Sequence, residues 1–263
     1  MNVLIVFAHP DSRSLNAALR DEAVRELVAN GHEVRISDLY RMGWKATVDH
    51  DDFPDLPPGE RLRVASASRE AFAAGSLTAD VAGEIEKLRW ADTVILQFPL
   101  WWFSMPAILK GWIERVYACG FAYGVGEHSD RRWGDRYGEG NLAGRRAMLV
   151  VTAGGWESHY GERGINGPIE DLLFPITHGM LHYPGFEVLP AFVAYRVDRM
   201  DEAGFRQTAA DLRARMRALA ETAPIPYRHQ NGGDYLIPSM ELRPGLEADG
   251  DRGIRMHLDR SRG

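Results

Sequence analysis

The sequence predicts an open α/β fold, in which a doubly wound sheet of five parallel strands carries helices on both faces. Short apolar runs alternate with amphipathic segments five times along the chain, which is typical of this class. Runs such as Val3-Leu4-Ile5-Val6-Phe7 are apolar on both faces, as central parallel strands are. Several strands end in loops rich in glycine, proline or aromatic residues, and such loops meet at the ligand-binding edge of a parallel sheet.

The first half of the chain predicts a βαβ unit followed by further helices. Strands are expected at residues 2–8 and 32–39, with a helix from about Leu15 between them. Leu15, Leu19 and Leu27 share one face of that helix, and Asn30-Gly31 ends it. An Asp- and Pro-rich loop at 49–60 precedes helices at 61–74 and 78–90. The third strand starts at residue 93.

The second half continues the alternation up to residue 222. An aromatic loop and a helix from Pro106 to about Tyr117 follow the third strand, and a long polar stretch covers 120–145. Strands at 147–152 and 185–195 and helices at 169–182 and 201–221 complete a sheet domain at residues 1–222. Residues 223–263 contain too few apolar side chains to fold alone. This irregular C-terminal extension is therefore expected to pack on the sheet domain or on a neighbouring subunit.

Composition excludes several classes of function. The 263 residues are 45% hydrophobic and 26% charged with a net charge of −6, which is ordinary for a globular protein. No Lys/Arg-rich block is present, so no nucleic acid partner is expected. The apolar stretch at 93–109 is short and interrupted by Gln97 and Pro99, so no membrane insertion is expected. No signal-peptide pattern opens the sequence, and the single Cys119 favours a reducing cytoplasm.

The aromatic loop at 99–106 is the most distinctive segment. Trp101, Trp102 and Phe103 can form a flat apolar wall beside free backbone N–H groups, which suits a planar ring system with a polar edge, such as a flavin. Burial in the core explains the same three residues equally well, because aromatic side chains are usually buried.

Two other loops are expected at the same edge. Residues 9–16 offer His9, the hydroxyl groups of Ser12 and Ser14, the charge of Arg13 and the N-terminus of a helix, a set that binds phosphate. A helix cap explains this cluster without any ligand. The turn at 152–155 lets backbone N–H groups approach a ligand closely, although an ordinary turn has the same composition.

Metal binding is not predicted. His178 and His182 have the i, i+4 spacing of metal ligands on a helix, but no third ligand can be argued, so packing roles are favoured.

One long motif resembles the DT-diaphorase-type NAD(P)H:quinone oxidoreductases. It reads Gln97-Phe98-Pro99-Leu100-x-Trp102-Phe103-x-x-Pro106-Ala107-Ile108-Leu109-Lys110-Gly111-Trp112-x-Glu114-Arg115-Val116, with Phe121-Ala122-Tyr123 after it. The resemblance extends in order from residue 2 to about 220. It implies a flavodoxin-like fold with strand order 2-1-3-4-5, bound FAD, and a homodimer with active sites at the interface. It also implies ping-pong, two-electron hydride transfer from NAD(P)H through the flavin to a quinone.

The resemblance also implies roles for individual residues. His9, Ser14, Leu15 and Asn16 would hold the phosphates and ribityl chain of the cofactor. Flavin-ring contacts would come from two loops and a tyrosine: Leu100, Trp101, Trp102, Phe103, Thr152, Ala153, Gly154, Gly155 and Tyr160. Tyr160, Gly154 and Asn166 would support the chemistry. Tyr123, Val125 and Tyr183 would border the pocket for quinone and nicotinamide.

Two departures from the family pattern bear on the chemistry. Asn166 stands where the family usually has histidine, and asparagine cannot take up a proton near neutral pH. Val125 stands where the family often has a second tyrosine in the pocket. The choice between NADH and NADPH stays open, with Arg131, Arg132 and Arg136 as candidates for binding a 2′-phosphate.

Three functions are alternatives to a quinone oxidoreductase. The first alternative is a relative of the FMN-dependent azo- or nitroreductases. The second is an ancillary regulatory subunit of a glutathione-gated potassium efflux system, although those proteins are generally shorter, without the polar insertion and the extension. A flavodoxin-like electron carrier is the third alternative, which the covering aromatic loop and the insertion disfavour.

Overall fold

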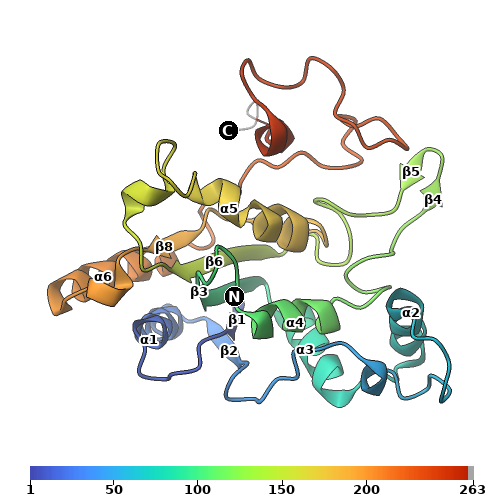
Figure 1. Cartoon of the computed structure of the whole chain (residues 1–263), viewed down its shortest axis with the longest axis horizontal. Coiled ribbons are helices and arrows are strands. Elements are labelled where there is room, and N and C mark those ends of the chain that lie inside the picture. Colours follow the sequence, from blue (N-terminus) through green and yellow to red (C-terminus); the bar gives the residue numbers. More distant parts are fainter. Residues whose placement is uncertain (260–263) are drawn as a thin grey trace.

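The computed structural model describes residues 1–259 and shows the predicted parallel sheet (Figure 1). Strands β2 (Glu33–Asp38), β1 (Asn2–Phe7), β3 (Thr93–Pro99) and β6 (Arg146–Thr152) lie side by side in that order. The fifth strand pairs with β6 in two pieces, β7 (Glu187–Val188) and β8 (Phe192–Ala194). All of these pairings are parallel, so the predicted flavodoxin-like fold and strand order are confirmed.

Helices cover both faces of the sheet, because alternate side chains of each strand point to opposite faces. On one face, Val3 and Ile5 of β1 pack with Leu19 of α1 (Leu15–Ala29) and Leu212 of α6 (Glu202–Arg217). The other face is covered by α3 (Ala79–Trp90), α4 (Ala107–Val116) and α5 (Ile169–Ile176). Helix α2 (Val64–Ala74) packs with Phe53 in a smaller cluster. Single-turn 3₁₀ helices occur at His50–Asp52, Glu157–Tyr160, Val197–Arg199 and Gly253–His257.

Three elements differ in detail from the prediction. The fifth strand is interrupted at Pro190, which has no N–H group to donate to a neighbouring strand. The helix expected at 169–182 changes after Pro175 into a π-helical segment, Thr177–His182. The polar insertion at 120–145 contains a small antiparallel hairpin of β4 (His128–Ser129) and β5 (Arg132–Trp133). Within residues 1–259, no helix combines the length and apolar character needed to span a bilayer.

The C-terminal extension contacts its own sheet domain along much of its length. Ile225 donates a backbone hydrogen bond to Val188 (2.7 Å), and the Tyr227 hydroxyl lies 2.8 Å from the Thr177 hydroxyl. Further along, the Gln230 side-chain amide donates to the backbone oxygens of residues 133 and 134 (3.2 and 3.1 Å). The extension therefore runs past α5 and reaches the β4–β5 hairpin (Figure 1).

Two histidines under the extension are held in their neutral form. Burial lowers the pKa of His178 to about 3, and the nearby His182 and His257 lower it further. Burial also lowers the pKa of His182 to about 4. His178 stacks against Phe174, with ring centroids 4.6 Å apart. Acidification therefore favours the unfolded chain, in which these imidazoles can be protonated.

We expect His178→Phe to weaken the acid sensitivity of folding. Below about pH 6.5 the unfolded chain binds a proton at each buried histidine that the folded chain binds only near pH 3 or 4, so the free energy of unfolding falls as pH falls. One histidine contributes up to about 1.4 kcal/mol per pH unit. Urea denaturation at several pH values between 7.5 and 4.5 should show a shallower decline in the variant. His128→Phe, at an exposed histidine, serves as the control. If the free energy of unfolding fell equally steeply with pH in the wild type and both variants, the assignment would be contradicted.

Candidate active site

Three loops meet at the carboxyl edge of the central strands. They follow β1, β3 and β6, which are adjacent in the sheet. Ala8, just after β1, donates its N–H to the Gln97 oxygen of β3 (3.0 Å), and Leu100, just after β3, donates to the Thr152 oxygen of β6 (2.8 Å). The strand pairing thus continues to the point where each loop departs, and it fixes the loop origins relative to one another.

Two buried amide side chains connect helix α1 to this edge. The Asn16 amide donates to the Thr152 hydroxyl (2.8 Å), and the Gln97 amide donates to the Asn16 backbone oxygen (2.7 Å). All three residues are at most 4% exposed. Hydrogen bonds in such a dry environment constrain geometry strongly, so the N-terminus of α1 is held against the ends of β3 and β6. The side chains of Asn16 and Thr152 thus support the site from within.

The aromatic loop forms a tight turn with a strained backbone. Trp101 and Ser104 exchange two backbone hydrogen bonds (3.0 and 3.1 Å), while Trp102 and Phe103 between them have φ values of +50° and +62°. Bulky residues pay about 1–2 kcal/mol each for this left-handed conformation, and such strain concentrates at functional sites. Trp102 is 93% exposed and Phe103 49%, so burial in the core does not explain these rings. The backbone N–H groups of both residues form no hydrogen bond within residues 1–259.

The turn after β6 leaves little room for a side chain at its two glycines. A Cβ atom on Gly155 would lie 2.9 Å from the Tyr160 ring, and one on Gly154 would lie 2.5 Å from the Asp198 carboxylate. Ala153 is buried and donates to the Ala194 oxygen (2.8 Å), which anchors the start of the turn. Among the described residues, the N–H groups of Gly154 and Gly155 have no acceptor. They are available to a ligand with hydrogen-bond acceptors.

Tyr160 lies over this glycine turn. Its ring is half-buried beside Tyr195, with centroids 5.6 Å apart, and its hydroxyl makes no hydrogen bond in the described chain. Burial raises the pKa of Tyr195 to about 12, and Glu157, Glu170 and Tyr160 contribute, so Tyr195 stays neutral. The Asn166 N–H donates to the oxygen of residue 159 (3.0 Å), which brings Asn166 back beside Tyr160. No hydrogen bond joins the Asn166 and Tyr160 side chains in residues 1–259.

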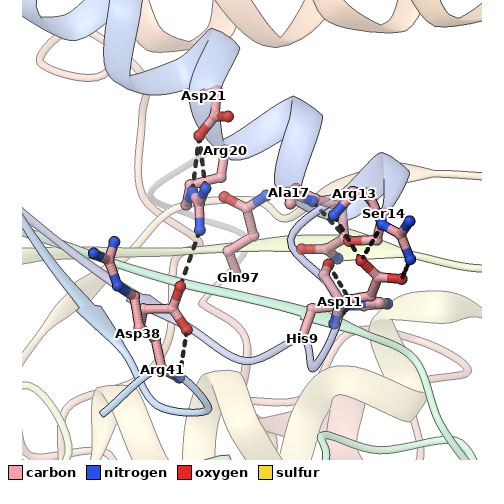
Figure 2. Close-up of polar contacts among 11 residues, drawn as sticks. His9, Asp11, Arg13, Ser14, Ala17, Arg20, Asp21, Asp38, Arg41 and Gln97 are labelled. Carbon is pink, nitrogen blue, oxygen red and sulfur yellow. Dashed lines mark hydrogen bonds and ion pairs between the residues drawn. The ribbon is translucent and has the colours of Figure 1, made fainter.

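Figure 2 shows how the loop after β1 uses its polar groups. The Ser14 hydroxyl caps α1 by accepting from the Ala17 N–H (3.1 Å). Arg13 pairs with Asp11 (3.3 Å), and its side chain is 88% exposed, so its charge is directed to solvent. The first N–H groups of α1, at Leu15 and Asn16, have no acceptor within the helix, as is general for a first turn. A phosphate at this loop would therefore be held mainly by backbone N–H groups.

His9 connects this loop to the aromatic turn. Its ring lies 6.0 Å from the Trp101 ring, and the Asp11 N–H contacts its Nδ1 (3.1 Å). His9 also borders a hollow of about 890 Å³ that extends toward the loop after β2. Arg20 and Arg41 line this hollow, and Arg20 pairs with Asp38 (3.2 Å). Sequence reasoning gave no role to these residues, although the end of β2 lies on the same sheet edge and could have indicated one.

The residues predicted to border the substrate pocket lie at the opposite edge of the sheet. Tyr123 follows the end of α4, and Tyr183 precedes the start of β7, so both occupy the edge where the strands begin. Burial raises the pKa of Tyr123, and Cys119 and Tyr183 add to the shift. Figure 1 shows the polar insertion, which includes Val125, and the loop after β6 on opposite sides of the molecule. A single chain therefore does not bring Tyr123, Val125 and Tyr183 to Tyr160.

The two helical histidines have packing partners. His182 is close to the backbone oxygens of Phe186 (3.3 Å) and Arg228 (3.4 Å). Within residues 1–259, no group of three His, Cys, Asp or Glu side chains is placed to hold a metal ion. Of the three arginines considered for a 2′-phosphate, Arg132 already pairs with Asp135 and Glu139.

Comparison with known proteins identifies the family. The model of the flavodoxin-like fold family matches residues 1–216. The chain is 38% identical to the human ribosyldihydronicotinamide dehydrogenase [quinone] over 225 residues, which cover 85% of this chain and 94% of the relative. It belongs to the DT-diaphorase-type family of NAD(P)H:quinone oxidoreductases. The sequence-based assignment to this family is thereby confirmed.

Two further relatives match nearly the whole chain. A ribosyldihydronicotinamide dehydrogenase-like protein of Penicillium crustosum is 59% identical over 257 residues, 98% of this chain and 95% of the relative. A crystal structure from Klebsiella pneumoniae, described as a candidate quinone reductase, is 62% identical with a TM-score of 0.95, covering 98% of this chain and 99% of the other. At 98% coverage, nearly all of the C-terminal extension lies within both matches.

The carboxyl edge of this family member fits a flavin. The aromatic turn presents an exposed apolar surface, and unpaired N–H groups at the aromatic and glycine turns lie at the same edge to meet polar atoms of a ring system. A flavin is planar and has such polar edges. The strained backbone at Trp102 and Phe103 is what exposes this apolar surface.

We expect Phe103→Gly to stabilise the protein without flavin and to weaken flavin binding. Glycine adopts φ of +62° without strain, so the free energy of unfolding should rise by about 1 kcal/mol. The lost ring should lower flavin affinity at least tenfold. Denaturation of the cofactor-free protein and fluorescence titration with flavin measure the two effects. Trp133→Gly, which removes a similarly exposed ring from an ordinary backbone, should give no gain in stability. Unchanged flavin affinity in Phe103→Gly would contradict the assignment.

Proposed function

We propose that this protein is an FAD-dependent NAD(P)H:quinone oxidoreductase. The observation that carries the proposal is the strained, exposed turn at Trp102 and Phe103, set beside the unpaired N–H groups of Gly154 and Gly155. Family membership supports it, because the relatives named above include a dehydrogenase for ribosyldihydronicotinamide and quinone. When bound, the flavin supplies two-electron hydride chemistry, with NAD(P)H and the quinone using the site in turn.

In this proposal the protein positions the cofactor and stabilises charge at its polar edge. The N–H groups of Gly154 and Gly155 would hold the pyrimidine end of the ring, and the Tyr160 hydroxyl would donate a hydrogen bond near the C2 carbonyl. Donors that are already oriented cost no reorganisation when negative charge develops. The Tyr160 hydroxyl has no competing acceptor within residues 1–259. Thr152 and Ala153 support this end from the buried side.

Asn166 changes how protons are handled. A histidine at this position could take up a proton near pH 7, whereas asparagine can only donate or accept hydrogen bonds. We therefore assign Asn166 a positioning role beside Tyr160, and we propose that protonation does not require a tyrosine–histidine relay. The rate of hydride transfer should then show no ionisation near pH 6.5 that arises from this position.

FAD is proposed rather than FMN. His9, Ser14, Leu15 and Asn16 lie at the N-terminus of α1, where N–H groups bind phosphate. The adjoining hollow of about 890 Å³ gives room for an adenosine half beyond the phosphates. FMN would leave this hollow empty.

We further propose a homodimer with its active sites at the interface. The cofactor edge and the edge that carries Tyr123, Val125 and Tyr183 lie apart in one chain, so a complete site needs the second edge from another copy. The exposed apolar side chains of Trp102 and Ile165, each 93% accessible, support a covering partner because large exposed apolar groups mark interaction surfaces. A cytoplasmic location is proposed from the single, buried Cys119.

Anaerobic stopped-flow measurements test the function. The flavin of the FAD-reconstituted protein should be bleached by NADH or NADPH and reoxidised by quinones. Mass spectrometry of the cofactor extracted from the protein as purified, before reconstitution, should show FAD. Recovery of FMN alone would favour the azo- or nitroreductase alternative. Flavin binding without quinone turnover, together with co-purification of a potassium efflux transporter, would favour the regulatory-subunit alternative. If the protein bound neither FAD nor FMN, the whole assignment would be overturned.

Within this experiment, Tyr160→Phe should slow hydride transfer at least tenfold while flavin remains bound. Removing one oriented donor from a site of developing charge commonly has an effect of this size or larger. Tyr195→Phe is the matched control, because it removes a hydroxyl from the same tyrosine pair without touching the glycine turn. Unchanged rates in both half-reactions of Tyr160→Phe would show that the hydroxyl has no such role.

Mixing two defective variants tests the shared site. Gly155→Ala should lose flavin because its new Cβ would collide with Tyr160, whereas Tyr183→Ala should keep flavin but turn over quinone poorly. In a mixed dimer, the flavin bound to a Tyr183→Ala chain faces the edge of the Gly155→Ala chain, which still carries Tyr183. Turnover per bound flavin should therefore rise after subunit exchange. If each chain held a complete site, mixing the two variants would leave turnover per bound flavin unchanged.

A further inference from the structure

A second cavity lies beneath the C-terminal extension, away from the three loops of the candidate active site. Its volume is about 360 Å³, within the range of small-ligand pockets. It is bordered by the polar insertion, helix α5 with the π-helical segment after it, and the extension. Its wall consists of Arg136, Tyr137, Phe174, His178, Arg228, Gln230, Tyr235, Met240 and His257.

The cavity wall contains two sets of stacked rings. His178 stacks with Tyr137 (centroids 4.7 Å apart, 26° between planes) and with Phe174 (4.6 Å, 11°). His257 stacks with Tyr235 (5.9 Å, 20°), whose hydroxyl also lies 2.8 Å from His257 Nδ1. Aromatic rings favour offset stacking on one another. Both faces of His178 are covered by Tyr137 and Phe174, so it borders the cavity with its ring edge. A ring edge suits the face of a planar aromatic molecule, in an edge-to-face contact.

Arg136 gives the cavity an unmatched positive charge. Its Nε donates to the Gln230 side-chain oxygen, but no carboxylate pairs with its guanidinium group among residues 1–259. The other arginine of the wall, Arg228, is paired with Asp234 (2.8 Å). Arg136 is half-buried, and a partly desolvated charge without a counter-ion is costly. A guanidinium group binds a carboxylate through two parallel hydrogen bonds.

We propose that this cavity binds a planar aromatic acid, whose ring face packs against the edges of the Tyr137–His178 stack and whose carboxylate pairs with Arg136. The two binding elements come from different parts of the chain: the insertion supplies Arg136 and Tyr137, and the rest of the wall comes from α5, its π-helical segment and the extension. None of these residues belongs to the flavin edge. Tyr137 and Arg136 nevertheless contact Tyr183, which the proposed function places at the substrate pocket, so displacement of the ligand by NADH distinguishes the two sites.

Isothermal titration of the full-length, FAD-reconstituted protein with 1-hydroxy-2-naphthoate tests the proposal. We expect saturable binding of one molecule per chain. 1-Naphthol, which has the same rings without the carboxylate, should bind at least tenfold more weakly. Absence of saturable binding of 1-hydroxy-2-naphthoate would overturn the proposal.

Variants locate the binding site. Arg136→Met should weaken binding of 1-hydroxy-2-naphthoate at least tenfold and leave binding of 1-naphthol almost unchanged, whereas Tyr137→Leu should weaken both. Arg131→Met, an exposed arginine of the same insertion, should change neither. Melting temperatures confirm that each variant is folded. If Arg136→Met binds like the wild type, or if NADH displaces the probe while both variants bind normally, the probe occupies another site and the proposal is wrong.

Discussion

Hydrogen bonds between buried amides determine the geometry on which the candidate active site depends. Asn16, Gln97 and Thr152 come from α1, β3 and β6, and their mutual contacts hold the start of the helix against two strand ends. The aromatic turn and the glycine turn start from those same strand ends. Because the supports are buried and rigid, the loops can present strained backbone and unpaired N–H groups at the surface without losing their positions.

Much of this arrangement could be predicted from the amino-acid pattern. Apolar runs such as Val3–Phe7 mark central parallel strands, and the alternation with helices leaves few possible topologies. The motif at 97–116 then identified the family and the fold. The role of each loop residue was harder to predict, since Trp102 in the core and Trp102 at the surface have the same local sequence. Only the backbone, with φ of +50° at Trp102, separates the two interpretations.

Other features depended on contacts between distant segments and could not be read from local sequence. The break of the fifth strand at Pro190 has a local cause, but the placement of Tyr123 and Tyr183 at the opposite edge follows from chain direction. The pairing of Arg13 with Asp11 also went unpredicted, and it directs to solvent a charge that sequence reasoning offered to a phosphate. The division of the chain at residue 222 stays a prediction, as do the roles of the individual site residues.

The polar insertion and the C-terminal extension supply hydrogen-bond partners to each other. Gln230 and Asn231 of the extension donate to backbone oxygens around Gly134 of the insertion, although about a hundred residues separate them in the chain. Neither segment has a hydrophobic core of its own. Each depends on the other for partners to its polar groups, so the two segments behave as one module. The extension is thus anchored to the sheet domain through the insertion as well as through β7 and the π-helical segment.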